Sequence, residues 1–130
     1  MSDSPPVFDS SSLLSNTGGD VELAAEILEI FRNQAELWGR MLDPASPGGE
    51  WADAAHSLKG TALSAGALRL AASCARAEAA GRSGESTLTE AAVLLSEVKD
   101  DLAEAIEAAA AAAHEIAVSG ALKASKDSNS

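Results

Sequence analysis

The residues of this chain that are best suited to chemistry lie in a segment whose apolar residues recur at helical intervals. On a helix, positions i, i+3 and i+4 share one side, so His56, Lys59 and Gly60 are expected to lie together. Ala52 and Leu63 flank the same strip. The core-facing positions fall on a different arc: Trp51, Ala55, Leu58, Ala62 and Ala65. The imidazole is therefore predicted to face solvent.

This combination suits a histidine that carries a phosphoryl group. A neutral imidazole nitrogen is a competent nucleophile, since unperturbed histidine titrates near about 6.5. The Lys59 ammonium, one turn on, can neutralise phosphoryl oxygens. Glycine inside a helix costs about 1 kcal/mol relative to alanine, so Gly60 indicates that space is needed there. The alternative is an exposed histidine with an incidental lysine and a tolerated glycine, which the triplet alone does not exclude.

A wider set of residues shares the pattern of a known family. These residues are His56-Ser57-Leu58-Lys59-Gly60, Gly66-Ala67, Leu70, Cys74 and Glu78, with Phe8-Asp9 and Gly18-Gly19-Asp20 upstream. In them the chain resembles histidine phosphotransfer (HPt) domains. The resemblance implies a helical bundle over residues 8–118 whose exposed histidine relays phosphate between receiver-domain aspartates of a two-component phosphorelay. Leu63 departs from the family, in which this position is commonly small, and this affects the fit of partners.

Composition restricts the class of protein. The 130 residues suit one domain, and all four prolines lie at or before Pro47, which favours an all-α fold. A net charge of −11 disfavours nucleic acid as a partner. The single cysteine, Cys74, excludes an internal disulfide and is read as a structural thiol. No signal peptide, membrane-spanning stretch or acidic metal-binding loop is recognised, so a cytoplasmic protein without membrane or metal is expected.

Capping and breaking residues divide the chain into helices. The expected helices are 9–15, capped by Asp9; 20–42, capped by Asp20; 46–65, opened by Ser46-Pro47 and stopped by Gly66; 67–80; and 88–118, after a 81–86 loop and a capping box at Thr87. These predict an antiparallel up-down-up-down four-helix bundle with a short extra N-terminal helix. Residues 1–7 are expected to form a disordered tail and 119–130 a flexible polar tail. The inner seam of the last helix is expected to run from Leu88 to Ile116. Periodicity leaves open which phase of 67–80 is core.

Helix rise and antiparallel packing predict the neighbours of His56. Glu78 is expected at the level of His56, where its carboxylate could accept a proton from one ring nitrogen and orient the ring. Alternatively, Glu78 is solvated or pairs with Arg82. Leu37 and Met41, with Leu63, are expected to form an apolar surface on which a partner docks. The alternative is that the N-terminal helix covers Leu37 and Met41.

Three functions remain compatible with the sequence. The first is a phosphorelay intermediary with His56 as sole phosphoacceptor, and the second is a bundle that only binds proteins, with His56 unmodified. The third is the histidine-bearing part of a chemotaxis-type kinase, which would need a catalytic domain elsewhere. No glycine-rich ATP loop is recognised, so neither enzyme activity nor autophosphorylation from ATP is expected, and His114 is read as structural or solvated. The resemblance implies receiver domains or a hybrid histidine kinase as partners of a monomer that needs no cofactor, since Mg²⁺ would come from the receiver.

Overall fold

The computed structural model describes the backbone of residues 5–128 and the side chains of residues 5–118. Over this range the chain is all-helical, without strands, which confirms the expected all-α class. The helices are α1 (Ser10–Asn16), α2 (Val21–Gly39), α3 (Gly48–Ala65), α4 (Leu68–Ser83) and α5 (Leu88–Ser128). The ends of the two predicted tails, residues 1–4 and 129–130, lie outside the described residues.

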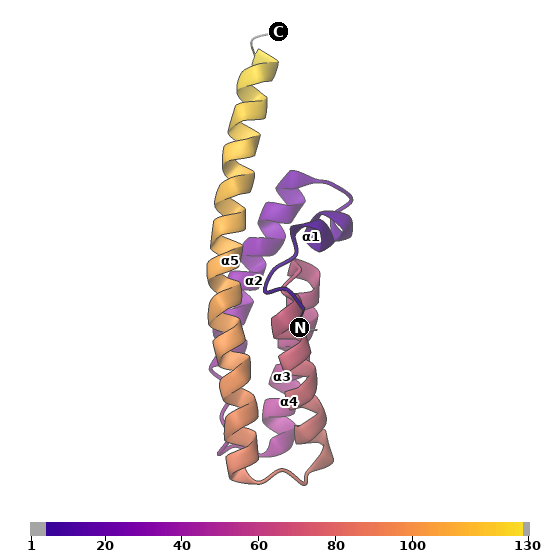
Figure 1. Ribbon diagram of the computed structural model, residues 1–130, viewed down its shortest axis with the longest axis vertical. Coiled ribbons are helices and arrows are strands. Elements are labelled where there is room, and N and C mark those ends of the chain that lie inside the picture. Colours follow the sequence, from indigo (N-terminus) through magenta and orange to yellow (C-terminus); the bar gives the residue numbers. More distant parts are fainter. Residues whose placement is uncertain (1–4, 129–130) are drawn as a thin grey trace.

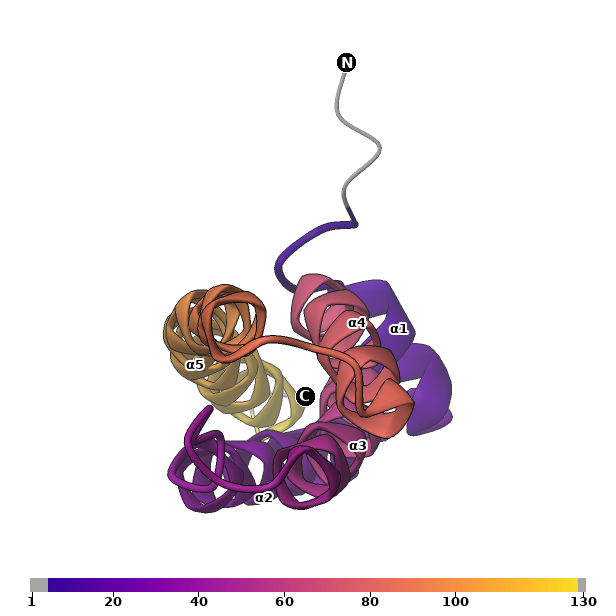
Figure 2. The same ribbon diagram turned by 90° about the horizontal axis from the view of Figure 1, so that it is seen from below.

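Helices α2 to α5 lie side by side, and consecutive helices run in opposite directions along the long axis (Figure 1). Viewed along that axis, α2 packs against α3 and α5, and α4 packs against the same two helices from the other side (Figure 2). The short α1 contacts α2 and α3 near the end of the bundle where α3 gives way to α4. The space between the four long helices holds the largest fully buried side chains, among them Leu28, Phe31, Leu58, Leu70, Leu95 and Val98.

The N-terminal segment is anchored on α4 as far back as Pro5. Asp9 caps α1 by accepting from the backbone N–H groups and hydroxyls of Ser11 and Ser12. These hydrogen bonds, chiefly those from the hydroxyls, lower the pKa of Asp9. The Pro5 and Pro6 carbonyls accept hydrogen bonds of 3.0 Å from Arg69. Pro5 and Pro6, which belong to the tail predicted for residues 1–7, therefore make hydrogen bonds to α4.

Helix α2 ends earlier and α3 begins differently than expected. Asp20 caps α2 through the Leu23 N–H at 3.1 Å, as predicted, but α2 ends at Gly39 rather than near Leu42. Leu42 is nonetheless buried in the connection that follows. The predicted Ser46 cap of α3 is wrong, because its hydroxyl donates to the Asp43 carbonyl and Pro47 occupies the cap position.

Close approach between α3 and α4 explains two further differences. Gly81, predicted to open a loop, lies inside α4, which ends at Ser83 and is capped by Gly84 with a left-handed φ of 70°. A Cβ atom on Gly81 would lie 2.7 Å from both the Ala52 Cβ and the Gly48 carbonyl. Ala52, predicted to flank the outer strip of His56, is therefore fully buried against α4. Gly81 therefore allows α3 and α4 to pack closely, and it does not end a helix.

Burial shows which of the two possible sets of residues on α4 faces the core. On α4 the set containing Leu70, Cys74 and Ala77 is fully buried, as the family resemblance favoured.

Thr87 accepts from the Glu90 N–H at 3.1 Å, as the capping box predicted, but Leu88 is exposed rather than part of the inner seam. The backbone of α5 continues as helix to Ser128, beyond the expected end at 118. Over the described part of the chain, none of the helices combines the length and the hydropathy that crossing a membrane requires.

Candidate functional site: an exposed histidine on α3

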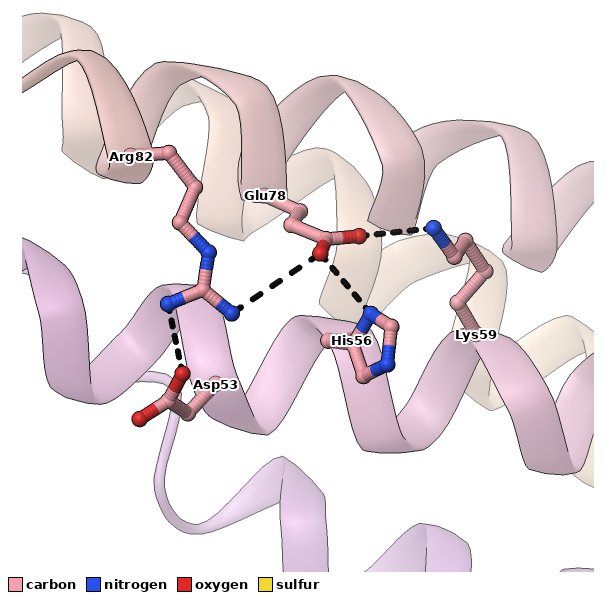
Figure 3. Close-up of polar contacts among 5 residues, drawn as sticks. All are labelled: Asp53, His56, Lys59, Glu78 and Arg82. Carbon is pink, nitrogen blue, oxygen red and sulfur yellow. Dashed lines mark hydrogen bonds and ion pairs between the residues drawn. The ribbon is translucent and has the colours of Figure 1, made fainter.

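His56 projects from the outer face of α3 into solvent, as predicted, with 61% of its side chain exposed. Its Nδ1 lies 2.8 Å from Oε2 of Glu78 on α4 (Figure 3). An ionised carboxylate only accepts hydrogen bonds, so this contact assigns the ring proton to Nδ1. The lone pair then resides on Nε2, which points away from Glu78 (Figure 3). The geometry presents a free nucleophilic nitrogen to an approaching molecule.

Glu78 connects the side chains of His56 and Lys59. Its Oε1 accepts a hydrogen bond of 2.7 Å from Lys59 Nζ, while Oε2 faces His56. The Lys59 hydrogen bond, followed by those from His56, lowers the pKa of Glu78 against an opposing effect of burial. Glu78 is therefore a carboxylate at neutral pH. Both pairings considered for it occur, because Arg82 Nη2 also lies 3.8 Å from Oε2.

Gly60 leaves open space beside the imidazole. A Cβ atom built on Gly60 would meet nothing within 4 Å apart from its own helix. The α4 side of α3 offers no such space, since Gly81 is enclosed by Ala52 and Gly48. The glycine near His56 therefore provides clearance toward solvent, as its position on the helical wheel predicted.

The sequence did not predict the ion pair that Asp53 and Arg82 form beside the histidine. Asp53 Oδ1 accepts a hydrogen bond of 2.6 Å from Arg82 Nη1, and both side chains are exposed (Figure 3). Asp53 precedes His56 by three residues and Arg82 follows Glu78 by four, so helical spacing already placed each beside a site residue. The missing signal was the rotation of α4 relative to α3, which decides whether the two groups meet.

The three predicted docking residues are about half exposed but do not share one hollow. Leu37 is 50% exposed, and Met41 and Leu63 are each 48% exposed, so α1 does not cover them. Two hollows of about 550 and 500 Å³ lie along the junction of α2 and α3, with Gly60 lining the first and Met41 the second. Leu63 lines another hollow, between α1 and α3, and Leu37 lines none of these three.

Neither Cys74 nor His114 belongs to the group of side chains that contacts His56 (Figure 3). Burial, with a smaller contribution from Asp101, raises the pKa of Cys74 to about 12, which keeps the thiol protonated and unreactive. His114 is exposed on α5. Among residues 5–118 no group of three or more His, Cys, Asp and Glu side chains is arranged to hold a metal ion.

Comparison with known proteins identifies one family. The model of the Hpt domain matches residues 20–112, a range that contains all five side chains of Figure 3. No match was found among curated proteins or among solved structures.

Proposed function

The chain belongs to the Hpt domain family, and from that premise we propose that it relays a phosphoryl group between receiver-domain aspartates through His56. Histidine phosphotransfer within phosphorelays is the general role of the family. The observation that carries the assignment to His56 is its 2.8 Å contact to Glu78 through Nδ1, with Nε2 left in solvent. The framework proposed for this role is the up-down-up-down four-helix bundle.

The transfer step follows from that geometry. Nε2 attacks the phosphorus of a receiver's aspartyl phosphate in line, the Nε2–P bond forms as the P–O bond breaks, and the receiver's carboxylate leaves. The Nδ1 proton stays in place, so the phosphorylated ring is cationic and donates to the Glu78 carboxylate. Glu78 thus stabilises the product as well as orienting the nucleophile. The reverse step uses the same contacts.

Lys59 and Gly60 assist at the phosphoryl group. The Lys59 ammonium, 2.7 Å from Glu78 before transfer, is close enough to swing toward phosphoryl oxygens that arrive on the neighbouring imidazole. Gly60 provides the clearance that those oxygens and the partner's loop require. Mg²⁺ belongs to the receiver in this scheme, and the chain itself contributes position and charge.

The receiver is proposed to dock across the α2 and α3 face. Leu37 and Met41 offer exposed aliphatic surface on α2 and just beyond its end, and Leu63 extends the strip of His56 on α3. The hollows along the two helices form a concave surface into which a helix or loop of the partner can fit. An exposed apolar surface beside a reactive group is typical of a partner site.

Further parts of the proposal concern the setting of the chain. Hpt domains are phosphotransfer modules without kinase sites, and we propose accordingly that this chain does not phosphorylate itself from ATP. We further propose a monomeric, cytoplasmic protein that needs no cofactor of its own. Its partners would be response-regulator receiver domains, a hybrid histidine kinase, or both.

Incubation with a phosphorylated receiver domain tests the proposal. The expected result is acid-labile, base-stable phosphate on the wild-type protein and on His114→Gln, with none on His56→Gln. Circular dichroism should show that both variants stay folded, because both histidines are exposed. Binding of the receiver without any labelled histidine would instead support a module that only binds proteins, and label on His114 would refute the assignment to His56.

A further inference from the structure

Four charged side chains form a continuous row around His56. Lys59 contacts Glu78 Oε1, Glu78 Oε2 lies 3.8 Å from Arg82 Nη2, and Arg82 Nη1 contacts Asp53 at 2.6 Å (Figure 3). Two cations and two carboxylates therefore alternate, and their formal charges cancel. The row is exposed at its Asp53 end, where the carboxylate side chain is 71% exposed, and mostly covered at Glu78.

Arg82 is unequally shared between its two carboxylates. Its contact with Asp53 is a short hydrogen bond, whereas its separation from Glu78 exceeds hydrogen-bond length. The Glu78 oxygen that it approaches is the one that faces His56 Nδ1. Asp53 thus holds Arg82 close to the imidazole without letting it bond to the carboxylate that orients the ring.

A phosphoryl group on Nε2 would change this balance. The group brings about two negative charges, which draw Lys59 away from Glu78. Arg82 is then the nearest remaining cation that can replace Lys59 at Glu78 or add to the neutralisation of the phosphoryl oxygens. Asp53 opposes both moves, since it competes for Arg82 and adds its own negative charge three residues before His56.

Resting on the proposed function, we propose that Asp53 sets the phosphoryl-transfer equilibrium of His56 by restraining Arg82. Both are positioning residues, which act on the histidine through Glu78 and through their charge. With Asp53 present, phosphorylated His56 is less stable than the cluster could make it, which keeps the group easy to pass on. Without Asp53, the released Arg82 would retain the phosphoryl group on His56.

A structural role for the ion pair gives a different expectation. The pair also links α3 to α4, but an exposed ion pair contributes little to stability. The tight packing of Ala52 against Gly81 already joins these helices. A purely structural pair would alter thermal stability and leave the transfer equilibrium unchanged.

The equilibrium itself provides the test. A receiver domain phosphorylated with acetyl phosphate and known to label the wild-type chain is mixed with each variant, and the phosphohistidine fraction is measured at equilibrium. We expect Asp53→Asn to raise the equilibrium constant for phosphohistidine about fivefold and Arg82→Gln to lower it by a similar factor. In the Arg82→Gln background, Asp53→Asn should have a much smaller effect, because no cation remains to be released. Arg82→Lys retains the charge and should lie between wild type and Arg82→Gln.

Matched controls use another exposed ion pair, which Arg76 on α4 forms with Glu97 on α5. Arg76→Gln and Glu97→Gln change the net charge by the same amounts and should leave the constant within twofold. The proposal fails if Asp53→Asn has the same effect with and without Arg82, if it has no effect or the opposite sign, or if Arg82→Lys falls as low as Arg82→Gln. A wild-type chain that no receiver labels would refute the proposed function itself, which is a separate result.

Discussion

Helix α3 meets its two long neighbours in different ways. Toward α4 the contact is closed, and a single added methyl group at Gly81 would collide with Ala52 and with the backbone of Gly48. Toward α2 the two helices leave hollows of about 500 and 550 Å³, bordered by exposed apolar side chains such as Met41 and Ile30. The same helix therefore has one side without spare room and one side with space for another molecule.

The difference indicates a division of tasks around one histidine. On the closed side Glu78 lies 2.8 Å from His56 and also contacts Lys59, so the orientation of the imidazole depends on α4. Under the proposed function a receiver covers the open side, so we expect recognition to depend on α2. Changes on the α4 side should therefore damage chemistry or stability, and changes on the α2 side should damage partner binding alone.

The largest effect is expected where the closed side touches the imidazole. Glu78→Ala removes the acceptor of the Nδ1 proton and the partner of Lys59, so phosphotransfer to His56 should fall about 100-fold. Glu78→Gln keeps an oxygen that can accept the hydrogen bond from the Nδ1–H group, and it should lose much less. Rapid-quench measurement of phosphohistidine formation distinguishes these results. Equal rates for Glu78→Ala and wild type would show that the ring needs no orienting partner.

Paired glycine substitutions compare the two sides of α3 directly. Gly81→Ala forces backbone atoms apart and should destabilise the fold by about 2 kcal/mol. Gly60→Ala meets open space and improves helix propensity, so it should stabilise the fold by about 0.5–1 kcal/mol. Urea denaturation measures both changes. Two losses of similar size would mean that the open side is packed as closely as the other.

A smaller effect is expected in the pH dependence of stability. Hydrogen bonding by Lys59 and His56 lowers the pKa of Glu78 below its ordinary value of 4.5, so charged Glu78 favours the folded state. Relative to Glu78→Gln, the wild-type advantage should be complete at neutral pH and disappear as pH falls through the lowered pKa. Thermal melts between pH 7 and pH 3 should show a difference of roughly 2 °C that vanishes in acid. A difference that persists at pH 3 would place the stabilisation elsewhere.

The helical periodicity of the sequence was sufficient to predict some parts of the site but not others. The outward direction of His56, Lys59 and Gly60 follows from positions on one helix, and the level of Glu78 follows from helix rise and one turn. The Asp53–Arg82 bond depends on how α4 is rotated about its axis, which a weakly patterned, alanine-rich helix does not reveal.

Glycine accounts for one of the errors in the helix boundaries, the end of α4. Gly66 ends α3 as predicted, with a φ of 86°, yet Gly81 lies inside α4 with its position determined by contact to α3. The residue type is the same, and only the packing partner distinguishes the two roles. Leu88 was assigned to the inner seam of α5 by spacing alone, although at the first turn it lies beyond the end of the core and is 65% exposed.

The division of tasks on α3 is tested most directly by comparing two phosphoryl donors. A phosphorylated receiver must dock, whereas phosphoramidate is a small molecule that passes its phosphoryl group to an imidazole with loss of ammonia. Leu37→Asp should reduce the rate from the receiver about tenfold and leave the rate from phosphoramidate unchanged, with Val93→Asp on exposed α5 surface as the charge-matched control. Lys59→Ala should reduce both rates about tenfold while stability changes by less than about 0.5 kcal/mol. If Leu37→Asp lowers both rates, or neither, the surface that carries Leu37 is not the docking face and the account is contradicted.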